Sequence, residues 1–139
     1  AGGSADLGKI GDLFLIDKII SETDGPAYYS NVLFKHGMNE ASLTTVNNPV
    51  VDGNETYDGL VDMEALEIWN ILKSIIPNDR FIFLKVISDY MDNKCLNIKS
   101  FEKKATKILI YQLNPIRNLL NILQEIVIND HSALNKNEK

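Results

Sequence analysis

The sequence predicts an all-α fold, a compact bundle of about five to six helices with a long irregular loop after the second helix. The main evidence is a run of apolar residues three or four positions apart between residues 61 and 129, the spacing of one buried face per helix. Pro77 and Pro115 divide that run into separate helices. A chain of 139 residues with 45% hydrophobic content is long enough to bury one core.

The first half of the chain predicts two short helices. Apolar residues between positions 13 and 20 share one face of the first helix, which Gly25 and Pro26 end. The second helix spans residues 28–34 and closes at Gly37. From residue 38 to residue 58, β-branched residues and turn-forming pairs interrupt the helical spacing, so we expect a long loop, with a short hairpin as the alternative.

The second half predicts the remaining helices. Asp62 caps a helix that ends at Pro77, and the next helix, over residues 81–91, is apolar around so much of its circumference that we expect it at the centre of the core. A fifth helix begins at Asn97 or Ser100, and a sixth covers residues 116–127. These elements form a single helical domain, 9–129, with the long loop 38–58.

Both ends of the chain lie outside the predicted domain. Residues 1–8 form a flexible N-terminal segment whose Ala-Gly-Gly-Ser opening resembles a linker scar, and residues 130–139 form a frayed C-terminal tail. Cys95 is the only cysteine, so the fold requires no internal disulfide and suits a reducing compartment. No apolar run approaches the roughly 20 residues that span a membrane. We therefore expect an intracellular protein, cytoplasmic or nuclear, with no membrane span.

The sequence offers little reactive chemistry, which predicts a protein that is not an enzyme. A Cys95–His36 dyad lacks any supporting motif, and neither histidine belongs to a recognisable metal-binding pattern. Asp62, Glu64 and Glu67, with Asp58 just before them, offer carboxylates for an acid/base pair, but they also suit the first turn of a helix, where they stabilise its dipole. No catalytic residue, metal or cofactor is predicted.

Charge distribution suggests a partner surface instead. Acids outnumber bases 12 to 3 in residues 1–68, whereas bases outnumber acids 11 to 7 in residues 69–139. The predicted function is a protein-protein interaction domain, an adaptor or regulatory module, that binds an amphipathic partner helix or acidic peptide in an apolar groove between helices. The predicted partner-binding residues combine a basic stripe with two aromatic groups: Lys99, Lys103, Lys104, Lys107, Trp69 and Phe83.

Two further expectations concern partners. The alternative to the interaction domain is a structural subunit or helical-repeat fragment with an obligate oligomer interface, so a homo-oligomer is left open. Nucleic acid is disfavoured as a partner because the sequence pI is near 5.0 and the lysines are not interleaved with arginine or aromatic residues.

Overall fold

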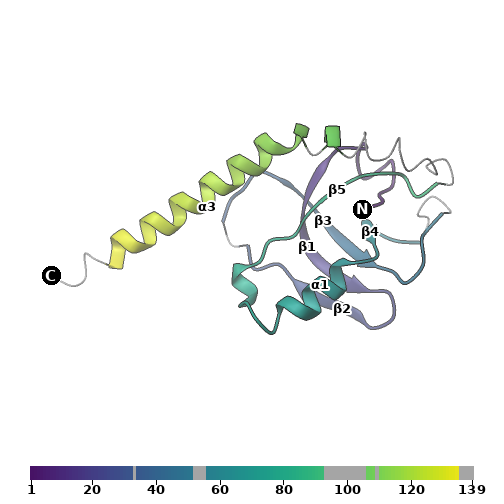
Figure 1. Ribbon diagram of the computed structural model, residues 1–139, viewed down its shortest axis with the longest axis horizontal. Helices are drawn as coiled ribbons and strands as arrows, with labels where there is room; N and C mark the ends of the chain where they lie inside the picture. Colours follow the sequence, from purple (N-terminus) through teal and green to yellow (C-terminus); the bar gives the residue numbers. More distant parts are fainter. Residues whose placement is uncertain (33, 52–55, 93–105, 109, 135–139) are drawn as a thin grey trace.

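The computed structural model describes residues 1–32, 34–51, 56–92, 106–108 and 110–134 (Figure 1). It has a mixed α/β fold built around a five-stranded sheet, so the prediction of an all-α bundle is wrong. The elements follow in chain order: β1 Leu13–Ser21, β2 Gly25–Tyr29, β3 Asn39–Thr45, β4 Leu60–Asp62, α1 Ala65–Leu72, the 3-10 turn η1 Asn78–Arg80, β5 Leu84–Val86 and α3 Leu113–Leu134.

Strand β1 organises the sheet. It pairs in parallel with β3 along most of its length, in antiparallel with β5 at its beginning, and in antiparallel with β2 at its end. Strand β3 in turn pairs in parallel with β4. Gly25, with φ of 82°, provides the left-handed backbone that lets β1 and β2 meet in a hairpin.

The first residues of the chain join the two outer strands. Gly2 forms bridges to Val61 in β4 and to Asp89, shortly after β5. Backbone hydrogen bonds from Gly2 to Val61 (2.8 Å), from Ser88 to Ala1 (2.8 Å) and from Gly3 to Asp89 (3.1 Å) hold this arrangement. Pairing therefore runs in a closed circuit from β1 through β3, β4 and residues 1–3 to the β5 segment and back to β1.

Two predicted helices contain strands instead. Residues 13–20 lie in β1, whose Phe14, Leu15, Ile16 and Ile19 are at most 3% exposed. A strand with partners on both sides and cover on both faces loses the polar alternation that identifies strands, so its apolar residues also fit a helical period. Residues 81–91, predicted as the central helix, contain the half-buried strand β5, which has three residues and is too short for an alternation of polar and apolar residues to show.

Two further predictions fail in the first half. The predicted helix 28–34 begins inside β2, where Tyr28 is 1% exposed. The predicted loop 38–58 contains β3, because the β-branched Thr44 and Thr45 suit a strand that pairs with β1 on one side and β4 on the other. The expected long irregular connection shrinks to the residues between β3 and β4.

The clearest helical patterns agree with the structure. The predicted helix after Asp62 contains α1, and the predicted helix 116–127 lies within α3, which continues to Leu134 beyond the predicted domain end. In Figure 1, α3 extends past the sheet with its C-terminal half projecting away from the other elements. Most of the predicted fifth helix falls outside the described residues.

The main core lies between the sheet and α1. Buried residues Ala65 and Trp69 face the sheet, where the Tyr28 ring meets the Trp69 ring edge-on at 4.7 Å between centroids. No helix in the described part of the chain is both long enough and apolar enough to cross a membrane.

Candidate functional site

A buried carboxylate marks the carboxyl end of β4. The Asp62 side chain is 2% exposed and accepts hydrogen bonds from Thr45 Oγ1 (2.8 Å) and from the Ala65 amide (3.1 Å). The Ala65 contact ties the carboxylate to the first turn of α1, where the exposed amide groups favour a negative charge. Asp62 thus fixes the start of α1 against the end of the sheet.

Lys85 joins Asp62 to a second carboxylate. Its Nζ lies 2.6 Å from Asp62 and 2.7 Å from Glu64. Burial lowers the pKa of Lys85, but the hydrogen bonds to both carboxylates outweigh burial, so its pKa is raised above the usual value. The hydrogen bond from Lys85 lowers the pKa of Glu64. Lys85 therefore remains a cation and Glu64 a carboxylate around neutral pH.

A third carboxylate lies just after β5. Asp89 accepts a hydrogen bond from Ser88 Oγ (2.6 Å) and another from the Met91 amide (2.8 Å). Met91 has φ of 55°, a conformation that non-glycine residues rarely adopt and that often accompanies functional sites. The turn from Asp89 to Met91 fixes the direction of the Asp89 carboxylate.

These groups line one cavity of about 240 Å³ beyond the carboxyl ends of β3 and β4. Its polar lining residues are Asp62, Glu64, Ser88 and Asp89, and its apolar lining residues include Val61 and Met63. We call four further apolar lining residues the pocket wall: Val46, Pro49, Val50 and Met91. The rim at Gly2 needs glycine, because an added Cβ would overlap the Met91 side chain. Apolar walls with a few convergent polar groups are typical of small-molecule sites.

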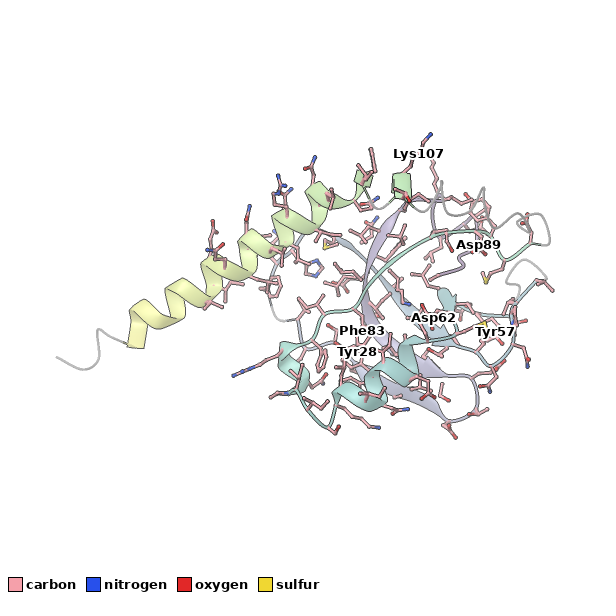
Figure 2. All side chains as sticks on the ribbon, viewed as in Figure 1. Tyr28, Tyr57, Asp62, Phe83, Asp89 and Lys107 are labelled. Carbon is pink, nitrogen blue, oxygen red and sulfur yellow. The ribbon has the colours of Figure 1, made fainter. Side chains whose placement is uncertain are left out.

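The predicted aromatic partner residues lie in the core. Trp69 is 8% exposed and donates its indole N–H to the Ala27 carbonyl (3.1 Å), and Phe83 packs edge-on against Tyr28 with 5.4 Å between ring centroids. Figure 2 shows Phe83 beside Tyr28 in the interior, whereas Lys107 lies at the outer margin. Lys107 is exposed. Lys99, Lys103 and Lys104 lie outside the described residues, so their role as partner-binding residues stays a prediction.

The chemistry set aside at the sequence level gains no support around His36. Its Nε2 lies 3.1 Å from Glu40 Oε1, and its ring contacts Phe34, while Cys95 falls outside the described residues. Within the residues that the structure describes, no group of three or more His, Cys, Asp or Glu side chains is placed to hold a metal ion.

Sequence reasoning recognised part of the polar side of the pocket but gave it another role. Asp62 and Glu64 were attributed to the helix dipole, and Asp62 does contact the start of α1. Lys85 and Asp89 were missed because residues 81–91 were predicted as a helix. The available signal was Asp62, which directly follows the apolar pair Leu60-Val61, since ligands in α/β sheets bind beyond the carboxyl ends of parallel strands.

Comparisons with solved structures find a similar fold in two nucleosidases. No protein-family model and no curated protein matches the chain. An Asp→Asn variant of MTAN from Chlamydia trachomatis, solved bound to MTA, matches with a TM-score of 0.61 and 22% identity over 84% of this chain and 60% of its own. The same protein solved bound to adenine matches with a TM-score of 0.56 and 23% identity over 84% of this chain and 59% of its own.

A plant protein has the same fold. The 5′-methylthioadenosine nucleosidase of Arabidopsis thaliana, in its apo form, matches with a TM-score of 0.59 and 20% identity over 87% of this chain and 58% of its own. The chain therefore spans about three fifths of the length of the structures it matches. At these identities the likeness establishes the α/β fold.

These matches correct the functional predictions. The non-enzymatic helical interaction domain and its alternative, a helical-repeat or structural subunit, both required an all-α fold that the chain does not have. The matching structures are those of enzymes, so the prediction that the chain is not an enzyme is contradicted as well. The inter-helix groove expected to receive a partner helix is replaced by a small cavity at the ends of strands.

Proposed function

We propose that this chain forms the nucleoside-binding part of a nucleosidase-type enzyme that acts on a purine nucleoside. The observation that carries the proposal is the cavity in which Glu64 and Asp89, each held by a hydrogen-bond donor, face an apolar wall. A nucleoside has matching parts, because its base is flat and largely apolar on its faces while its sugar presents hydroxyl donors. MTA, bound in one matching structure, has both parts, and adenine, bound in another, has the base alone.

Glu64 is assigned to the sugar. A carboxylate accepts hydrogen bonds from hydroxyl groups, and its charge stabilises the positive charge that develops on the sugar as the bond to the base breaks. Lys85 keeps Glu64 ionised and directs its carboxylate, with Nζ 2.7 Å from Oε1. The Lys85 side chain is 14% exposed, so the ion pair is largely shielded from water on the side of the cation.

Asp89 is assigned to the base. In hydrolysis, water adds its oxygen to the anomeric carbon, while the electron pair of the glycosidic bond leaves with the base, which must take up a proton. The attacking water loses a proton, which balances the one that the base takes up. Asp89 is placed to accept a hydrogen bond from the base, because Ser88 and the Met91 amide hold its two oxygens in fixed positions. The apolar pocket wall would cover the face of the base.

Binding of adenine and MTA to the full chain, measured by calorimetry, tests these assignments. Asp89→Asn should lower the affinity for both ligands about tenfold, because a hydrogen bond to a charged group usually contributes that much to binding. Glu64→Gln should lower the affinity for MTA by a similar factor but leave the affinity for adenine nearly unchanged, because adenine has no sugar. Glu67→Gln is the matched control, since Glu67 lies in the first turn of α1 but does not line the cavity.

Release of adenine from MTA is measured separately from binding. We expect Asp89→Asn to reduce any release seen with the unsubstituted chain by at least the factor lost in binding. Failure of the unsubstituted chain to bind both adenine and MTA at millimolar concentration would refute the nucleoside assignment. Equal losses of adenine affinity in Glu64→Gln and Asp89→Asn would refute the division into a sugar side and a base side.

A further inference from the structure

We infer that Glu22, which lies outside the cavity, is a positioning residue that holds the pocket wall in place through Tyr57 and Asn47. We call these three residues the Glu22 clasp. The identity of the ligand used to test it rests on the proposed function, whereas the contacts themselves do not. The clasp follows from where its two hydrogen-bond donors lie in the chain.

Glu22 is fixed to the end of the sheet. It follows β1 directly, and its backbone amide donates to the Thr45 carbonyl (3.2 Å), which continues the pairing of β1 with β3 by one residue. Its carboxylate accepts a hydrogen bond from the Tyr57 hydroxyl at Oε1 (2.6 Å) and from the Asn47 amide at Oε2 (3.3 Å). The hydrogen bond from Tyr57, followed by that from Asn47, lowers the pKa of Glu22.

The two donors come from opposite ends of one connection. Asn47 lies two residues after β3 ends, and Tyr57 lies three residues before β4 begins. A single carboxylate therefore holds both ends of the segment that links these strands. This segment supplies three of the four residues of the pocket wall, Val46, Pro49 and Val50.

Tyr57 also contacts the apolar side of the cavity. Its ring and Val50 pack against the buried cluster of Val46, Val61 and Met91, all three of which line the cavity. The same side chain thus touches the pocket wall with its ring and Glu22 with its hydroxyl. An ordinary surface hydrogen bond would join Glu22 to one neighbour, whereas this carboxylate links the sheet end to both ends of the wall segment.

Two substitutions remove the clasp without removing a residue that lines the cavity. Tyr57→Phe deletes the hydroxyl but keeps the ring in the cluster, and Glu22→Ala deletes the carboxylate. Glu40→Ala is the matched control, because Glu40 is an exposed carboxylate on β3 whose partner His36 lies outside the cavity. All variants are made in the full chain and compared with the unsubstituted protein.

Amide hydrogen exchange gives the first measurement, and it needs no ligand. We expect faster exchange at Val46 and Asn47 in Tyr57→Phe and in Glu22→Ala, and no change there in Glu40→Ala. Unchanged exchange at these amides in both clasp variants would overturn the inference, whether or not the chain binds a nucleoside. The melting temperature of each variant shows whether faster exchange reflects local opening or general loss of stability.

Adenine affinity gives the second measurement. Each clasp variant should bind adenine about 3- to 10-fold more weakly, the range expected for one hydrogen bond, and the double variant should be no weaker than the worse single variant because both act through one contact. Unchanged adenine affinity in the clasp variants would overturn the positioning role, as would additive losses in the double variant. If the unsubstituted chain binds no adenine, the proposed function fails, and hydrogen exchange alone decides the clasp.

Discussion

At the scale of single residues, the most consequential group is Asp62, a carboxylate with a side chain only 2% exposed. Charges are rarely buried without a partner, because removing them from water costs several kcal/mol. Asp62 has three partners: the Thr45 hydroxyl, the Ala65 amide and the Lys85 ammonium. Each partner belongs to a different element, so one carboxylate connects β3, the start of α1 and β5.

Lys85→Met should lower the free energy of unfolding by about 3–5 kcal/mol, because it leaves the buried Asp62 charge without its cation. Urea denaturation at neutral pH measures the change. Lys85→Arg keeps the positive charge, so its free energy of unfolding should fall clearly less than that of Lys85→Met. A loss below about 1 kcal/mol for Lys85→Met would mean that Asp62 is solvated in the folded chain, contrary to its burial.

At the scale of elements, the connection into β4 depends on one glycine. Gly59 has φ of 141°, and a Cβ built there would lie 2.5 Å from the Ser42 carbonyl oxygen. That oxygen belongs to the backbone of β3, which cannot move aside without disturbing the sheet. Gly25 also has positive φ, but a Cβ there meets nothing within 4 Å.

The two glycines form a matched pair for experiment. Gly25→Ala should cost about 1 kcal/mol of unfolding free energy from backbone strain alone. Gly59→Ala should cost clearly more, about 2–4 kcal/mol, because a collision with the backbone is added to the strain. Chemical denaturation of both variants measures the difference. Equal losses of unfolding free energy would show that the backbone between β3 and β4 shifts easily to make room for the added Cβ.

The elements also show which parts of the fold the sequence could predict. The α1 and α3 helices were predicted because each keeps an exposed polar side, which makes the helical period visible. Residues 13–20 are predicted as a helix because both faces of β1 are covered and the alternation of polar and apolar residues disappears. Residues 81–91 are predicted as a helix because β5 has only three residues, too few to show an alternation. Parallel pairing of β1 with β3 depends on contacts between distant residues, which no local pattern encodes.

The candidate site was less predictable than the fold. The sequence shows Asp62 and Glu64 as neighbouring carboxylates, but their place in the site depends on the ion pairs with Lys85, which is more than 20 positions away from either in the sequence. Asp89 depends on a turn at Met91 whose positive φ no residue preference predicts, since methionine rarely adopts it. Sequence alone gives the residue types, whereas the cavity arises from pairing between β4, β5 and residues 1–3.

At the scale of the whole molecule, acid should destabilise the folded chain. The pKa values of Glu22 and Glu64 are both lowered by hydrogen bonds, from Tyr57 and Lys85 respectively. A lowered pKa in the folded state adds stability above the unfolded value of 4.5, and this stability is lost as the pH falls through the folded pKa. The melting temperature should therefore decline below about pH 4.5.

The double variant Glu22→Gln with Glu64→Gln identifies the groups responsible. Its melting temperature should be lower than that of the unsubstituted chain at neutral pH, and the difference should shrink as the pH falls below 4.5. Thermal unfolding between neutral pH and about pH 3 measures both curves. A difference that stays constant over this range would assign the acid sensitivity to other carboxylates.

The closed circuit of strand pairing affects how the chain folds while it is being synthesised on the ribosome. Ala1 is synthesised before Ser88, yet its carbonyl accepts a hydrogen bond from the Ser88 hydroxyl across 87 positions. At a synthesis rate of about 5–20 residues per second, Ser88 and Asp89 emerge several seconds after Ala1 and Gly2, which line the same cavity. Until then β1 lacks its β5 partner and Gly2 lacks its bridge to Asp89, so a nascent chain is open to intermolecular strand pairing during that interval.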